Sequence, residues 1–104
     1  MALGTLTTRV DSNGQTIFAR PPSGHVNARV LAGAAESVTV PTGAKFAVFS
    51  ATADFYANST ATAAAATDID NGSASELNPS VWDVTGLTSI SLFGTASVTV
   101  AFYS

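Results

Sequence analysis

The chain of 104 residues has no cysteine, one histidine, one tryptophan and few charged side chains, four of them basic and seven acidic. Without cysteine, neither a disulfide framework nor a thiolate metal site can form, so stability has to come from packing or assembly. The net charge of -3 lacks the basic excess of a protein that neutralises many phosphates, so we expect no nucleic-acid partner. No stretch approaches the roughly 18 consecutive apolar residues of a membrane span, and the first residues do not resemble a secretory signal. We therefore expect no membrane partner.

A catalytic triad is not supported by the sequence. His25 is the only candidate base, it follows a Pro-Pro-Ser-Gly turn, and no Gly-x-Ser-x-Gly motif accompanies it. Asp54, Glu76 and Asp83 could in principle pair as the carboxylates of a glycosidase, but any chain with seven acids offers such pairs. We therefore expect that the protein is not an enzyme, with His25 in a surface or structural role.

One acidic segment invites comparison with a calcium loop. Residues 68–72 read Asp-Ile-Asp-Asn-Gly, but setting Gly72 at the glycine of an EF-hand loop puts Thr67 and Ile69 on ligand positions. Asn78 then stands where the bidentate glutamate belongs. We expect an Asn-Gly turn with solvated acids, and no metal or cofactor.

Small, hydroxylated and β-branched residues dominate what is present. Alanine supplies 19 residues, serine and threonine 26, and valine and phenylalanine 16. Glutamate, lysine, arginine and glutamine, which favour helix surfaces, are scarce. This composition predicts sheet rather than helix.

The local patterns predict short strands separated by turns. Asn13-Gly14, between the runs 5–10 and 15–20, predicts a hairpin. The next run has the period of a half-buried strand, with Val26, Ala28 and Val30 alternating with His25, Asn27 and Arg29. Further strands are predicted over 37–40, 45–51, 54–57, 81–85, 88–93 and 96–103. Residues 59–75 are predicted to be a long surface loop.

The run 45–51 has apolar residues on both faces, Phe46 and Val48 on one and Ala47 and Phe49 on the other. This pattern predicts a central strand that is covered on each side.

Turn signals at this spacing predict an all-β fold, a single antiparallel β-sandwich or jelly-roll-like domain. We divide the chain into an N-terminal arm or hairpin, residues 1–35, and a sandwich body, residues 36–104. The alternative is that residues 1–35 are the first strands of the same sandwich.

Charge differs between these two parts. Residues 1–35 carry Arg9, Arg20 and Arg29 against one aspartate, which gives +2, whereas residues 36–104 carry one lysine against six acids, which gives -5. Complementary surfaces of this kind can steer association between proteins, so the three arginines are interface candidates. The alternative is ordinary solubilising charge.

Two aromatic residues are further interface candidates. Most aromatic side chains at strand spacing belong to the core, but Tyr56 and Trp82 carry polar tips that need partners when buried. In a shallow exposed groove, either could stack against a carbohydrate.

The segments 38–56 (VTVPTGAKFAVFSATADFY), 75–79 (SELNP) and 97–103 (SVTVAFY) resemble a recurring pattern in small, cysteine-free virion proteins of tailed bacteriophages. The resemblance implies a non-enzymatic virion structural protein, first of all a capsid cement or decoration protein that binds the outer shell and stabilises it. It implies the major capsid protein or other virion proteins as partners, and a homo-oligomer, with a trimer as one form. The expected location is the virion, after synthesis in the bacterial cytoplasm. The alternatives are a tail, collar or fibre-base protein, or a carbohydrate-binding module for host recognition.

Overall fold

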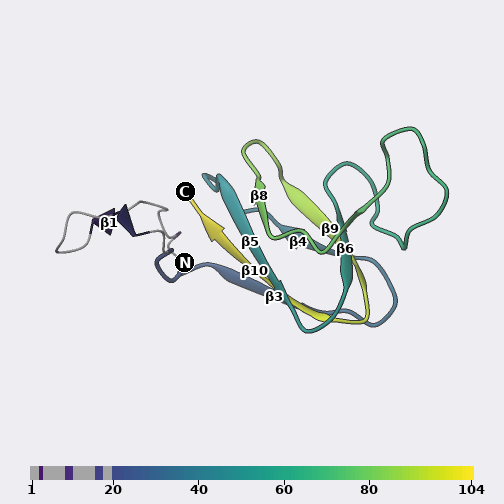
Figure 1. Ribbon diagram of the computed structural model, residues 1–104, viewed down its shortest axis with the longest axis horizontal. Coiled ribbons are helices and arrows are strands. Elements are labelled where there is room, and N and C mark those ends of the chain that lie inside the picture. The colour runs from purple at the N-terminus through teal and green to yellow at the C-terminus, as the bar shows by residue number, and fades with distance from the viewer. Residues whose placement is uncertain (1–2, 4–8, 11–15, 18–19) are drawn as a thin grey trace.

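The computed structural model describes residues 3, 9–10, 16–17 and 20–104, and in these residues the fold is all-β. Two four-stranded antiparallel sheets pack against each other as a β-sandwich (Figure 1), which confirms the predicted fold class. The β10 sheet has the spatial order β3 (Val26–Val30), β10 (Ser97–Tyr103), β5 (Phe46–Ala51) and β8 (Val81–Asp83). The β9 sheet has the order β4 (Glu36–Thr39), β9 (Ser89–Gly94), β6 (Phe55–Asn58) and β7 (Glu76–Leu77).

The predicted N-terminal hairpin is present in its paired residues. Strands β1 (Arg9–Val10) and β2 (Thr16–Ile17) pair antiparallel, with Arg9 opposite Ile17. The predicted turn at Asn13-Gly14 lies outside the described residues. This pair shares no strand with the two larger sheets.

Strand β3 lies within residues 1–35, for which the sequence allowed two interpretations, an N-terminal arm or the first strands of the sandwich. It pairs along its whole length with β10, from Val26 opposite Ala101 to Val30 opposite Ser97. Residues 26–30 therefore form the first strand of the sandwich.

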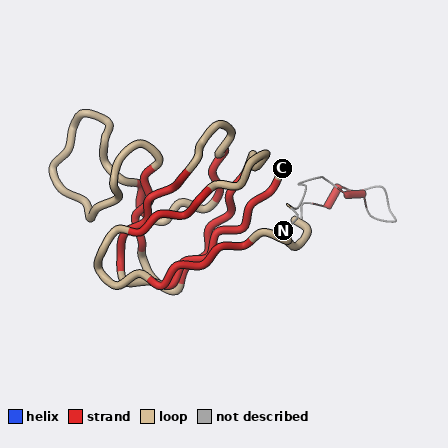
Figure 2. Tube along the Cα trace, turned by 180° about the vertical axis from the view of Figure 1, so that it is seen from behind, coloured by secondary structure: helices blue, strands red, loops and turns tan. Residues whose placement is uncertain are grey.

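The core lies between the two sheets, which Figure 2 shows from behind as two layers of strands. From β10, Val98, Val100 and Phe102 point inward with at most 1% of their surface exposed. From β9, Ile90 and Leu92 meet them and are fully buried. The alternation of inner and outer residues along these strands is the period of 2 that the sequence shows.

Strand β5 lies between β10 and β8, so the prediction of a central strand is confirmed. Its inner residues, Ala47 and Phe49, are buried, whereas Phe46 and Val48 on the outer face are only half-buried. The expected cover is therefore complete on the inner face and partial on the outer face.

Residues 59–75 contain no helix or strand, as predicted for a surface loop. The loop is anchored at both ends by the buried Asn58, whose Oδ1 accepts bonds from the main-chain N–H groups of Thr60 and Ala61, both at 2.9 Å. Its Nδ2 donates to the carbonyl of Ser73 at 3.2 Å.

The predicted Asn-Gly turn is present within this loop. Gly72 has a φ of 83°, and Asn71 Oδ1 accepts bonds from the N–H and hydroxyl of Ser73. This arrangement is an Asx turn of the kind that Asn-Gly sequences favour.

Two leucines of the β9 sheet give a matched test of the core. Leu92 is fully buried between the sheets, whereas Leu77 on β7 is 49% exposed. We expect Leu92→Ala to lower the free energy of unfolding by about 2–5 kcal/mol, because it removes packed methyl groups and leaves a cavity. Leu77→Ala should cost less than about 1 kcal/mol. Urea denaturation measures both, and equal losses would contradict this packing.

Candidate functional site

Strand β3 turns its polar side chains toward the second sheet. Asn27 Nδ2 donates to the carbonyl of Thr39 at 3.3 Å, and Arg29 Nε donates to the carbonyl of Ser37 at 2.9 Å. These carbonyls belong to the edge of β4, where they point away from β9. Asn27 and Arg29 therefore join the two sheets along one open side of the sandwich.

The same alternation turns the apolar residues of β3 outward. Val26 is 44% exposed and Val30 is 75% exposed, and Ala28 between them is also exposed. The sequence predicted the strand and its period, but the ordinary arrangement, with valines inside, is reversed here. The reason is that successive side chains must point to opposite faces, so Asn27 and Arg29 can reach β4 only if the valines face out.

These outward residues continue across the whole β10 sheet. The register places Val26 opposite Ala101, Ala101 opposite Val48, and Val48 opposite Val81. Val81, on the far edge strand β8, is 54% exposed. We call Val26, Ala101, Val48 and Val81 the valine row. It crosses all four strands and contains no charged or polar side chain.

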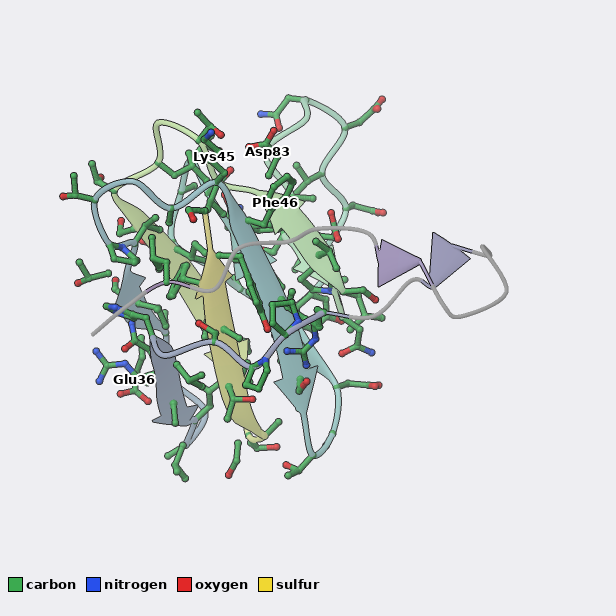
Figure 3. The ribbon with its side chains drawn as sticks, turned by 90° about the vertical axis from the view of Figure 1, so that its left-hand side faces the viewer. Glu36, Lys45, Phe46 and Asp83 are labelled. Atoms are coloured by element: carbon green, nitrogen blue, oxygen red, sulfur yellow. The ribbon has the colours of Figure 1, made fainter. Side chains whose placement is uncertain are left out.

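The next row of the same face carries larger side chains. Phe46 on β5 pairs with Asp83 on β8, and Figure 3 shows the two labelled residues close together. The N–H and hydroxyl of Thr85 donate to Asp83 Oδ1, and these bonds hold the pKa of Asp83 below its usual value. This keeps a charged group at the β8 end of the outer face.

On β10 the same row ends in the buried Tyr103, over which residues 20–21 lie. Arg20 Nη1 donates to the Tyr103 hydroxyl at 2.6 Å, and that hydroxyl donates to the carbonyl of Pro21 at 2.7 Å. The Arg20 guanidinium carbon is 5.8 Å from the centre of the tyrosine ring, within cation–π range. Arg20 thus has a structural contact as well as an exposed surface.

His25 lies at the start of an open groove of about 410 Å³ between β3 and β4. The His25 ring meets Phe102 edge-on with centroids 5.7 Å apart, and the main-chain N–H of His25 donates to Ser23 Oγ at 3.0 Å. The lining residues include Asn27, Arg29 and Thr39 but no carboxylate. The groove therefore does not join His25 to an acid as a hydrolytic site would require.

Trp82 closes the opposite side of the sandwich. Its Nε1 donates to Glu76 Oε2 at 3.3 Å, and its ring packs edge-on against Phe49 with centroids 5.2 Å apart. The side chain is half-buried, so it is neither a free stacking platform nor fully enclosed.

Tyr56 lies on the outer face of the β9 sheet, where it pairs with Phe93 on β9 and Leu77 on β7. It is half-buried and lies on the opposite side of the sandwich from the valine row.

The structure does not gather the five predicted interface residues into one site. Arg20 contacts the end of β10, Arg29 faces β4 with an ion pair to Glu36 at 3.8 Å, and the side chain of Arg9 is not among those described. The residues that sequence reasoning missed are the exposed valines of β3 and β8. Their signal was present as asparagine and arginine at alternate positions of β3, which can bond to a second sheet.

Within the described part of the chain, no group of three or more histidine, aspartate or glutamate side chains is placed to hold a metal ion. No described helix has the length and apolarity to cross a membrane. No family model matches the chain, and neither the curated proteins nor the solved structures provide a match.

The contact between Tyr103 and residues 20–21 can be tested with the two tyrosines of the chain. Tyr103→Phe removes both bonds of a buried hydroxyl, so we expect the free energy of unfolding to fall by about 1–3 kcal/mol. Tyr56→Phe is the control, because the Tyr56 hydroxyl makes no hydrogen bond to the described residues. Urea denaturation should show a clear loss for Tyr103→Phe alone; equal effects would argue against the contact.

Proposed function

We propose that the protein is a non-enzymatic structural protein that adds in many copies to a larger protein shell, which it binds through the outer face of the β10 sheet. The valine row is the observation that carries this proposal. The setting we propose is a bacteriophage virion, with the chain as a capsid cement or decoration protein bound to the major capsid protein and made in the bacterial cytoplasm.

The composition of the valine row supports a protein partner. The centres of protein interfaces are depleted in charge, and contiguous apolar surface rimmed by polar groups marks interaction sites. Val26 and Val81 are 44% and 54% exposed at the two ends of the row, while Ala101 between them is 8% exposed. Asp83 and Arg20 lie toward one end of this face, where they can orient a partner without interrupting the apolar row.

Binding of many copies to a repeated shell compensates for the weak contact that each small site makes. One chain offers a row only four strands wide, so each single contact is modest. Binding of many copies to one lattice, or of linked copies to neighbouring sites, raises the effective affinity without new contacts. Arg9, Arg20 and Arg29 stay candidates for contact with an acidic shell surface, although Arg29 already has Glu36 as its counter-ion.

The alternatives can be separated by stoichiometry and by site. A cement protein is present in a fixed ratio to the shell subunit, whereas a tail, collar or fibre-base protein is present in few copies per particle. Carbohydrate recognition through Trp82 has less support, because its indole N–H is engaged by Glu76 and its ring packs on Phe49.

The test uses virions assembled from the genome that encodes the chain, without this gene, to which purified protein is added back. We expect Val81→Asp to weaken binding at least about tenfold, because a carboxylate would have to be desolvated in the interface. Leu77→Asp is the matched control, since Leu77 is 49% exposed but lies on the β9 sheet. Co-sedimentation followed by quantification of bound protein measures both.

Binding of Leu77→Asp at the wild-type level, with loss for Val81→Asp, supports the outer face of the β10 sheet as the docking surface. Equal binding of wild type and Val81→Asp would refute it. Absence of wild-type binding to these particles would refute the virion setting.

A further inference from the structure

We propose that a second copy of this chain pairs with the edge of β3, so that two β10 sheets join into one continuous antiparallel sheet. This interface uses the main-chain edge of β3, whereas the proposed shell contact uses the outer face of the β10 sheet. Only Val26 belongs to both, and either interaction can fail without the other.

The hydrogen-bond pattern shows which groups of β3 are open to a second copy. Phe102 N donates to the carbonyl of His25 at 3.0 Å, and Leu31 N donates to the carbonyl of Ala96 at 2.9 Å. Because antiparallel strands bond at alternate residues, the odd-numbered residues of β3 face β10. The main-chain N–H and C=O groups of Val26, Ala28 and Val30 therefore point away from the sheet.

The other three edges of the two four-stranded sheets are protected in ways that β3 is not. Strands β7 and β8 are only two and three residues long. Two outward carbonyls of β4, at Ser37 and Thr39, already accept bonds from Arg29 and Asn27. Strand β3 has five residues, with no proline, no lysine and apolar outward side chains. Natural sheets use short edges, charges, prolines or covering groups to prevent pairing. The outward residues of β3 carry no charge and no proline, and its one charged residue, Arg29, points inward and is paired with Glu36.

A two-fold axis at Ala28 satisfies these groups. Val26 then lies opposite Val30 of the second copy, and Ala28 lies opposite its own counterpart. Each of these pairs exchanges two N–H···O bonds. Ala28, whose side chain is small, lies on the axis, where a residue is opposite the same residue of the second copy. Val26 and Val30, which are 44% and 75% exposed in one copy, pack against each other as cross-strand pairs.

Charge favours a copy of the same chain over a charged partner. Arg29 is 3.8 Å from Glu36, so the charge on the inner face of β3 is balanced within each chain. In the proposed register Arg29 lies opposite Asn27 of the second copy, not opposite another arginine. No like charges meet directly across the axis, and no unbalanced charge calls for a partner of the opposite sign.

The size of the contact sets the expected affinity. Standard interfaces bury about 800 Å² per partner. The edge of one five-residue strand offers less than this. We therefore expect a reversible dimer that forms as the protein concentration rises from about 1 µM to about 1 mM.

The test places charges on the two-fold axis of the full chain. Ala28→Lys and Ala28→Asp each put like charges opposite each other across the axis. In each variant alone, the dissociation constant of the dimer should therefore rise at least about tenfold. An equal mixture of the two should restore the dimer as a heterodimer. Sedimentation equilibrium measures the mass against the 10.5 kDa monomer. Val81→Lys and Val81→Asp, at the far edge, are the controls and should dimerise as wild type does.

Dimers that form in the mixture, but not with either Ala28 variant by itself, support the β3 interface and its register. The proposal is overturned if wild type stays monomeric to about 1 mM, if either Ala28 variant alone dimerises like wild type, or if mixing fails to restore dimers. Urea denaturation of each Ala28 variant must match wild type, and Ala28→Pro gives an independent check. It removes an outward N–H that β10 does not use, so a folded Ala28→Pro variant that still dimerises would also overturn the proposal.

Discussion

The side-chain hydrogen bonds from β3 to β4 determine how this small sandwich is completed. Asn27 and Arg29 reach across to the carbonyls of Thr39 and Ser37, which would otherwise form an open edge of the β9 sheet. Because side chains alternate along a strand, this orientation places Val26, Ala28 and Val30 on the outside. The edge of β4 is thereby closed, whereas the outward main-chain groups of β3 have no partner strand in either of the larger sheets and carry apolar side chains.

The two proposed interactions both follow from this orientation. The outward valines of β3 extend the apolar row across β10, β5 and β8, and the outward main-chain groups of the same residues form the free edge. Pairing of two copies would place two outer faces on one continuous sheet, and a two-site contact with a repeated lattice is stronger than either site alone. Because the chain has no cysteine, its stability has to come from packing, to which the proposed assembly would add.

Much of the fold could be predicted from local pattern. Strands β5 and β10, the 59–75 loop and the Asn71-Gly72 turn follow from period-2 alternation and turn chemistry, which are local properties. Which side chains of β3 point toward the second sheet could not be predicted in this way, because their direction depends on carbonyl groups of β4 that come close only after folding. For the same reason the contacts of Arg29, a predicted interface residue, with Ser37 and Glu36 could not be foreseen from the sequence.

The facing of β3 can be measured directly, because the chain has no native cysteine and a single introduced thiol reports on one position. Val30 is 75% exposed and its neighbour Leu31 is 3% exposed. In native protein at low concentration, we expect Val30→Cys to react with a soluble maleimide nearly as fast as in urea, and Leu31→Cys to be strongly protected. Protection of Val30→Cys with rapid labelling of Leu31→Cys would mean that the valines of β3 face the core, and it would contradict this account.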